Sequence, residues 1–362
     1  MNVQPTHNFT GDRAVPPGET LQEWLDERRM TQAELARRTS LTTKHINQVV
    51  KGVVGISPEV AISLERVTGV PARFWIQLDA NHRTARLGDD ELNRLRADTD
   101  LLDVFPVAEL RRRGHLPKRV SAAETVRAIY QFFGVADRSA LARTWIEQPT
   151  MLRPSAAFEP DDAALAAWVR LCELDALMAS AKAFDESTLR EALPDLRSLS
   201  QLPGIQWLKP LRQGLAHAGV VLVIEKELPK SRINGAARWV TPDRAMVAVS
   251  LRHRRDDIFW FTLFHELGHI LLHSKRRTFV DSTTTNIEAN IEDEADQFAS
   301  STLIPLSMES ELLELRNQHD IVAFARRLNV APGVVVGRLQ HEGVLPWNQM
   351  NHLLVRYEFI DE

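Results

Sequence analysis

The sequence predicts a mainly helical α+β protein, with an all-α N-terminal domain, a helical middle region and a C-terminal domain containing a small antiparallel sheet. Amphipathic segments of helical period, separated by Pro, Gly and Ser, occupy most of the chain. Three short β-rich runs, at residues 219–225, 236–240 and 245–251, precede one long apolar helix near residue 265. The 362 residues carry a net charge of −4, so overall charge gives no reason to expect a nucleic-acid or membrane partner.

Breaks in the pattern indicate four parts of the chain. We expect a flexible arm at 1–17, a helical domain at 18–84, a helical linker or scaffold at 85–204 and a last domain at 205–362. The N-terminus lacks a basic stretch followed by an apolar run, and no segment approaches the about 18 apolar residues of a membrane span. The single cysteine, Cys172, fits a reducing compartment. We therefore expect a cytoplasmic protein with no membrane partner.

The N-terminal domain has the pattern of a helix-turn-helix. Thr31 and Glu34 fit a capping box at the start of one short helix, and Ser40-Leu41 forms a tight turn before the next. Two short helices joined by such a turn are what the motif requires. The helical units are expected at Thr20–Arg28, Thr31–Arg38, Thr42–Val50, Pro58–Val67 and Pro71–Ala80.

Charge within this domain is segregated. Residues 35–58 carry four basic side chains and no acidic one. Cations and hydroxyl groups contact phosphates, and Asn or Gln can bind an adenine edge through two hydrogen bonds. The alternative is that these helices only pack against a partner or dimerise and that the basic side chains are solvated. The candidate DNA contacts are Arg38, Thr42, Thr43, Lys44, His45, Asn47, Gln48 and Lys51.

The segment Thr31–Gly52 also resembles the Xre/HigA-type family of regulators. The resemblance implies that Thr42–Val50 is the recognition helix and that double-stranded operator DNA is a partner. A homodimer would suit a helix-turn-helix protein, because operators commonly have two half-sites.

The middle region and the C-terminal end carry no chemistry that the sequence identifies. Ser121 and Glu124 fit a second capping box in the middle region. Phe324–Arg338 has another helix-turn-helix pattern, which fits either a contact with DNA or substrate or packing against the last domain. Thr241–Arg244 is expected to form the turn of the sheet, with Ala245–Leu251 as an edge strand to which a substrate backbone could be added.

The apolar helix over residues 258–272 is hydrophobic almost all round, which predicts a buried position. A buried polar group without a partner costs roughly 2–7 kcal/mol, so its His and Glu side chains need one. His265 and His269 lie one turn apart, so both imidazoles can bind a single ion. With Glu266 between them, they form the H-E-x-x-H pattern of zinc peptidases. Zinc would lower the pKa of a bound water to about 7, and Glu266 would accept its proton as general base.

Two histidines leave a tetrahedral zinc short of one protein ligand. The metzincin extension fails because Lys275 stands where its third His would be. His273 lies about 12 Å along the helix from His265, too far to share one ion, so we expect a structural or indirect role for it. The acidic segment Asn286–Ser301 is the better source, because residues 278–315 contain no Lys or Arg. The alternative is an ordinary solvated helix start.

From about Ile205 to Arg356 the chain resembles the ImmA/IrrE family of metallopeptidases, through Trp260–His273 and Glu292–Ala299. The resemblance implies a zincin-like domain with one Zn²⁺ ion. It also implies that Glu294 is the third ligand and that Asp296, where many members have Asn, orients a ligand imidazole. Members of the family cleave transcriptional repressors, often on a stress or DNA-damage signal.

Two functions remain open from the sequence. The first is a DNA-binding zinc endopeptidase that cleaves a regulatory protein, such as a repressor or a toxin. The second is an antitoxin-like transcriptional repressor, as in a toxin–antitoxin pair, whose zinc domain is a sensor or scaffold. Glu266 separates them, since only the endopeptidase requires a general base there.

Overall fold

The computed structural model describes residues 15–146, 160–273, 279–280 and 288–358. The chain forms two compact units, Met1–Ala97 and Asp98–Glu362. Most of the arm expected at residues 1–17 lies outside the described residues. Within the described part of the chain, no helix is both long and apolar enough to cross a membrane.

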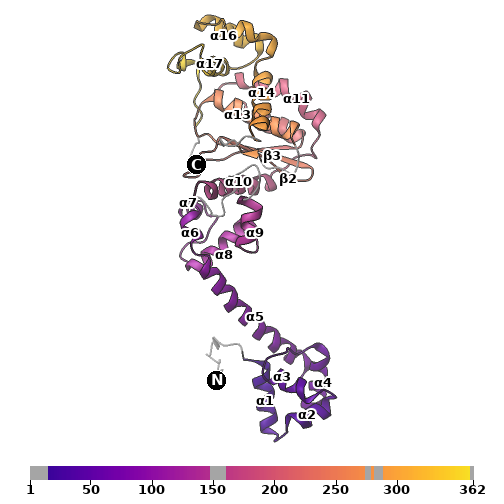
Figure 1. Ribbon diagram of the computed structural model, residues 1–362. Coiled ribbons are helices and arrows are strands. Elements are labelled where there is room, and N and C mark those ends of the chain that lie inside the picture. Colours follow the sequence, from indigo (N-terminus) through magenta and orange to yellow (C-terminus); the bar gives the residue numbers. More distant parts are fainter. Residues whose placement is uncertain (1–14, 147–159, 274–278, 281–287, 359–362) are drawn as a thin grey trace, which may run out of the picture. The chain divides into compact units, whose positions relative to one another are not determined.

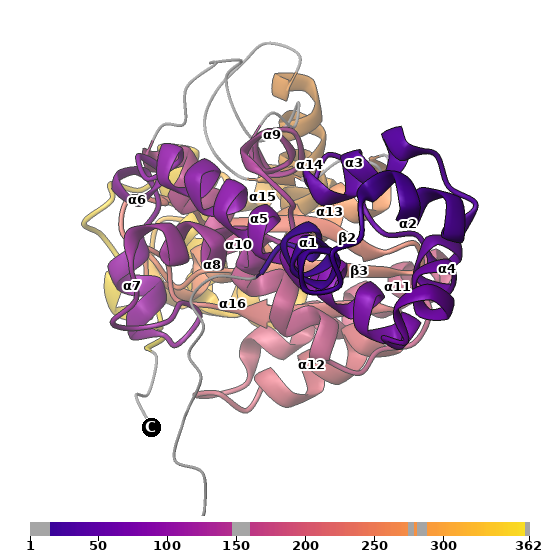
Figure 2. The ribbon, with the colours of Figure 1, turned by 90° about the horizontal axis from the view of Figure 1, so that it is seen from below.

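The first unit is a cluster of helices around a small apolar core (Figures 1 and 2). Leu35 of the second helix and Ile46 of the third are fully buried there. Ser40, between these two helices, has φ 57°, the left-handed conformation of the predicted tight turn. The predicted helix-turn-helix is thereby confirmed. The bounds are α1 Pro17–Glu27, α2 Gln32–Thr39, α3 Thr43–Val50, α4 Pro58–Thr68 and α5 Ala72–Ala97, the last of which continues past residue 84.

The two predicted capping boxes differ in outcome. At α8 the box is complete, because Ser121 accepts from the backbone N–H of Glu124 and the Glu124 carboxylate accepts from the backbone N–H of Ser121. At α2 only half forms: Thr31 accepts from the N–H of Glu34 at 3.1 Å. The Glu34 carboxylate instead accepts from Arg38 Nε at 2.7 Å, because the cation one turn ahead is the better partner.

Helices of the second unit enclose a small sheet on both faces. Helix α10 lies on one face, whereas α13 and α14 lie on the other (Figure 1). Trp168 of α10 is fully buried. Before the sheet come α6 Leu101–Val104, α7 Val107–Arg112, α8 Ala122–Phe133, α9 Arg138–Leu141, the π-helical turn Ala142–Ile146, α10 Pro160–Met178, α11 Glu186–Ser198, the 3₁₀ turn Leu199–Gln201 and α12 Leu208–His217.

The observed sheet differs from the predicted one in the direction of one strand pair and in the strand that lies at its centre. Its strands are β1 Val220–Ile224, β2 Gly235–Thr241, β3 Arg244–Val249 and β4 Phe279–Val280, in the order β1-β3-β2-β4. β2 and β3 form the expected antiparallel hairpin, but β1 pairs with β3 in parallel, so the sheet is mixed. β2 pairs with one edge of β3, and β1 pairs in parallel with the other edge. β3 is therefore a central strand, and its backbone is not available to a substrate.

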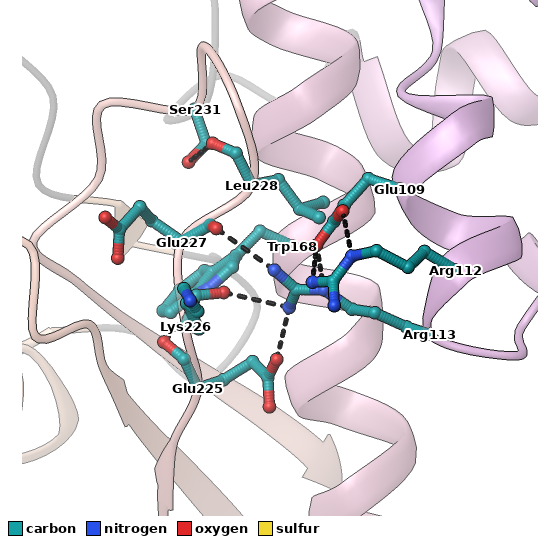
Figure 3. A network of polar contacts seen from close by, with 9 residues as sticks. All are labelled: Glu109, Arg112, Arg113, Trp168, Glu225, Lys226, Glu227, Leu228 and Ser231. Carbon is teal, nitrogen blue, oxygen red and sulfur yellow. Dashed lines mark hydrogen bonds and ion pairs between the residues drawn. The ribbon is translucent and has the colours of Figure 1, made fainter. Parts of the chain in front are cut away.

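Arg113, directly after α7, fastens the middle helices to the loop that follows β1 (Figure 3). Its guanidinium donates to the backbone carbonyls of Lys226 at 3.0 Å and Glu227 at 3.1 Å, and it pairs with the Glu225 carboxylate. Hydrogen bonds from Arg112 and Arg113 hold the pKa of Glu109 at about 2, so this carboxylate stays charged. The loop leading to β2 is thereby held by charged hydrogen bonds.

The remaining helices pack around α13, Asp256–Leu272. Gly268 lets α14 approach closely, because a Cβ there would lie 3.3 Å from Cα of Ala295. On α17 the predicted second helix-turn-helix packs against α13, with Gly333 against Asp256 and Gly337 against Asp257. These helices are α14 Glu288–Leu303, α15 Glu309–Leu312, α16 Gln318–Leu328 and α17 Pro332–His341, with 3₁₀ turns at Leu306–Met308 and Asn351–Leu353.

Candidate metal centre and DNA-binding helix

His265 and His269 of α13 meet Glu292 of α14 inside the second unit. The two Nε2 atoms lie 2.9 Å apart. Oε2 of Glu292 lies 3.1 Å from Nε2 of His265 and 3.5 Å from Nε2 of His269. All three ligand atoms fall within 4.8 Å of one another. Two imidazole nitrogens and a carboxylate oxygen that converge in this way are a suitable donor set for a divalent metal such as zinc.

The third member of this cluster corrects the expectation for Glu294. Ala295 of α14 faces Gly268 of α13 across the helix contact. At about 100° per residue, Glu292 then lies on the side of α14 toward His265, whereas Glu294 lies on the opposite side. The Glu294 side chain is 62% exposed, and its Oε2 lies 3.2 Å from Nε2 of His273.

The second nitrogen of each histidine also has a partner. Nδ1 of His265 lies 2.8 Å from Oδ1 of Asp296, the contact expected for a residue that orients a ligand imidazole. Nδ1 of His269 lies 3.0 Å from Nδ1 of His273, which in turn contacts Glu294. Two chains of polar contacts therefore fix the two imidazole rings, one through Asp296 and one through His273.

Burial sets the protonation states that metal binding requires. It is the largest cause of the lowered pKa of His269, which favours the neutral imidazole. Burial alone would raise the pKa of Glu292, but its hydrogen bonds with His265 and His269 lower this pKa to about 2. A neutral imidazole and an ionised carboxylate are the forms in which these groups bind metals. The residues therefore fit a metal ion electrostatically as well as geometrically.

Glu266 is fully buried where α13 meets β2. A Cβ at Gly235, the first residue of β2, would lie 2.6 Å from Oε1 of Glu266 and 2.6 Å from Cγ2 of Thr262. Only glycine fits at this contact, which holds the Glu266 carboxylate between the ligand helix and the sheet. The Glu266 side chain, directly after His265, is thus confined by its packing against β2.

In the first unit, the predicted DNA-contact residues fall into two groups. Thr43 and Lys44, at the start of α3, and Lys51, just after it, are exposed. Thr42 is also exposed and caps α3, its hydroxyl accepting from the N–H of His45 at 3.1 Å. Arg38 is exposed at the end of α2, where it pairs with Glu34. His45, Asn47 and Gln48 are half-buried.

Asn47 belongs to a chain of side-chain amides that the sequence did not reveal. Its Nδ2 donates to Oε1 of Gln32 at 3.2 Å, and Nε2 of Gln32 donates to Oε1 of Gln22 at 3.0 Å. The chain connects α1, α2 and α3 and orients the amides beside the exposed start of α3. The one sequence feature that could have indicated this chain of amides is the position of Gln32 as the first residue of α2.

The chain is similar to known proteins in two separate regions. Residues 21–75 match the helix-turn-helix family, and residues 219–340 match the IrrE N-terminal-like domain family. The second match contains the H-E-x-x-H residues and Glu292. The region between residues 75 and 219 lies outside both matches.

Individual relatives match shorter parts of the chain. An uncharacterized HTH-type transcriptional regulator of Escherichia coli K12, YddM, is 32% identical over 62 residues, which are 17% of this chain and 66% of the relative. The structure of PA4674 of Pseudomonas aeruginosa in complex with its operator DNA shares 34% identity, covering 21% of this chain and 82% of that one, with a TM-score of 0.20. An addiction module antidote protein of the HigA family from Coxiella burnetii shares 21% identity, covering 24% and 95%, with a TM-score of 0.22.

The family matches agree with the helix-turn-helix geometry in the first unit and with the paired histidines in the second. The match to the E. coli regulator covers just under two thirds of that protein's length and 17% of this chain. By these matches the chain joins an N-terminal Xre-type helix-turn-helix domain to a C-terminal domain of the IrrE/ImmA-like peptidase family.

Proposed function

We propose that this chain is a DNA-binding, zinc-dependent endopeptidase that hydrolyses a peptide bond in a regulatory protein, such as a repressor or a toxin. The convergence of His265, His269 and Glu292 supports the proposal most directly. A purely structural zinc site is usually closed by four protein ligands, commonly cysteines, whereas among the described residues this donor set has three members, which leaves a coordination position open. The match to a peptidase family over residues 219–340 supports the same function.

Each residue has a distinct role in the proposed reaction. His265, His269 and Glu292 would hold the ion, while Asp296 and His273 orient the two imidazoles. Zinc, when bound, supplies Lewis acidity that polarises the peptide carbonyl and acidifies a water molecule. Glu266 would take the proton from the attacking water and deliver it to the departing amine nitrogen. Its packing against Gly235 of β2 restricts the positions that this carboxylate can take.

The proposed DNA-binding part is the N-terminal domain, within the expected boundaries 18–84. The exposed start of α3, with Thr43 and Lys44, would contact double-stranded operator DNA. Lys51 and Arg38 would contact phosphates, with Arg38 exchanging Glu34 for the DNA backbone. Binding as a homodimer and a cytoplasmic location belong to the same proposal. DNA binding would place the peptidase domain near regulators bound at the same promoter.

The test is a comparison of the full chain with its Glu266→Gln variant. Both are loaded with zinc and incubated with candidate repressors and toxins from the host, and the products are identified by mass spectrometry. We expect one zinc per chain in both proteins and a defined cleavage product only with the wild type. Asp293→Asn, an exposed substitution beside Glu292, is the matched control and should cleave normally.

Equal cleavage by the Glu266→Gln variant would refute the proposed role of Glu266. If no host regulator is cleaved and the variant regulates transcription as the wild type does, the chain acts instead as an antitoxin-like repressor whose zinc domain is a sensor or scaffold.

A further inference from the structure

A mostly apolar pocket of about 290 Å³ opens between α13, α14 and α17. Each helix contributes side chains to its wall, and the loop after α17 adds an exposed tryptophan. The volume is near the lower limit of the roughly 300–1,000 Å³ found for small-molecule sites, so the pocket suits one large side chain better than a cofactor. Its apolar wall consists of Ile258, Phe261, Leu303, Ile304, Val334 and Trp347.

The pocket adjoins the candidate metal centre through Asp296. Asp296 lines it and also contacts Nδ1 of His265 at 2.8 Å. Thr262 lines it and lies beside Gly235, as Glu266 does. A substrate residue whose side chain occupied this pocket would therefore lie close to a peptide bond held at the metal centre.

Most charged groups of the wall already contact other protein groups, although Nε of Arg338 is buried without a hydrogen-bond partner in the residues that the structure describes. Asp257 accepts from Arg255 at 2.6 Å and 2.9 Å. Arg338 lies 2.9 Å from the carboxylate of Glu342. A charged substrate side chain would lose its hydration in the pocket and would face a wall whose charges are mostly engaged with other protein groups, which disfavours it. An apolar side chain would incur no such cost and would gain from burial.

We propose that this pocket binds a large apolar side chain of the peptide substrate, such as that of Leu, Met or Phe, directly beside the scissile bond. The proposal builds on the endopeptidase function and names the substrate feature that this site selects. Ser300 of α14 lines the pocket and is small, so a longer side chain there would fill it. The next residue, Ser301, is not part of the wall, and its hydroxyl donates to the carbonyl of Gln297 at 2.7 Å.

The experiment uses two dye-labelled hexapeptides that are identical except for one central residue, phenylalanine in one and alanine in the other. Their binding to the zinc-loaded full chain carrying Glu266→Gln is measured by fluorescence anisotropy, so that hydrolysis does not interfere. One methylene in an apolar pocket changes discrimination by about 10–200-fold, so we expect at least about ten-fold tighter binding of the phenylalanine peptide. Adding Ser300→Met should abolish this preference, and adding Ser301→Met should retain it.

A second variant covers the case in which Ser300→Met does not fold. Trp347→Ala removes a side chain that is 62% exposed, so the fold should tolerate it, but it opens the wall and should weaken binding of the phenylalanine peptide several-fold. The same phenylalanine preference in folded Ser300→Met, or equal binding of both peptides by the parent protein, would overturn the pocket assignment. Selective binding with no hydrolysis by the wild type would support the pocket while refuting the endopeptidase function.

Discussion

Nδ1 of His269 lies 3.0 Å from Nδ1 of His273, the residue directly after the end of α13. His273 connects the imidazole of His269 to the carboxylate of Glu294, whose Oε2 lies 3.2 Å from Nε2 of His273. Glu294 thereby contacts the site through His273 and lies outside the three converging groups. Asp296 makes the corresponding contact with His265 directly.

Replacing His273 by alanine should weaken zinc binding by about 10-fold or more, because partners of ligand histidines typically contribute 10–100-fold to metal affinity. Competition with a chromogenic chelator measures this change. His273→Asn can still hydrogen-bond Nδ1 of His269 and should recover part of the affinity. An unchanged dissociation constant for His273→Ala would show that the contact does not orient His269.

The identity of the third ligand can be tested by metal content. Glu292→Gln should lose most of its zinc on dialysis, because it removes the carboxylate that converges with the two histidines. Glu294→Gln should keep about one zinc per chain with a weaker affinity, and the neighbouring Asp293→Asn should match the wild type. Stoichiometric zinc in Glu292→Gln together with its loss in Glu294→Gln would reverse the assignment.

Asp256 should make stability depend on pH. Burial is the main cause that raises its pKa to about 7, and the adjacent Asp257 adds to this shift. An unfolded Asp has a pKa of about 3.9, so the native state holds the extra proton between these values and loses stability as the pH rises through them. Asp256→Asn cannot ionise, while its side-chain oxygen can still accept from the N–H of Val355.

Relative to wild type, Asp256→Asn should therefore gain stability from pH 5 to pH 8, by at most about 3 kcal/mol. Thermal or urea unfolding of both proteins at the two pH values measures the gain. A difference between the two proteins that is the same at pH 5 and pH 8 would contradict the raised pKa.

Lys44→Ala should weaken operator binding and lower the slope of log affinity against log salt by about 1, as expected for one lost phosphate contact. Gln48→Ala should reduce discrimination between operator and random DNA while leaving the slope closer to wild type. Anisotropy titrations over a salt series separate the two effects. Arg66→Ala, an exposed cation on α4 outside the basic segment, is the control and should change neither quantity.

The features that the sequence predicted correctly are those that depend on local geometry. Residues four apart on a helix must share a face, so the pairing of His265 with His269 followed from their spacing. The turn at Ser40 likewise followed from neighbouring residues. Each of these features involves only one or two adjacent elements.

Features that depend on contacts between distant segments could not be predicted from the sequence. Which carboxylate of α14 faces the histidines depends on the rotation of that helix about its axis, and this rotation is set by the packing of Ala295 against Gly268. The strands near residues 220 and 245 were found correctly, but their parallel pairing was not. Because β2 and β3 run in opposite directions, the direction in which β1 pairs depends on which of these two strands it lies against. The residues of β1 do not encode that choice.

The contacts of Gly333 with Asp256 and of Gly337 with Asp257 hold α17 to the first turn of α13, whereas the candidate ligands lie on later turns of α13 and on α14. One wall of the pocket can therefore change in sequence without disturbing the candidate ligands. Related chains could diverge in the peptides they recognise through substitutions in α17 while keeping the same hydrolytic chemistry.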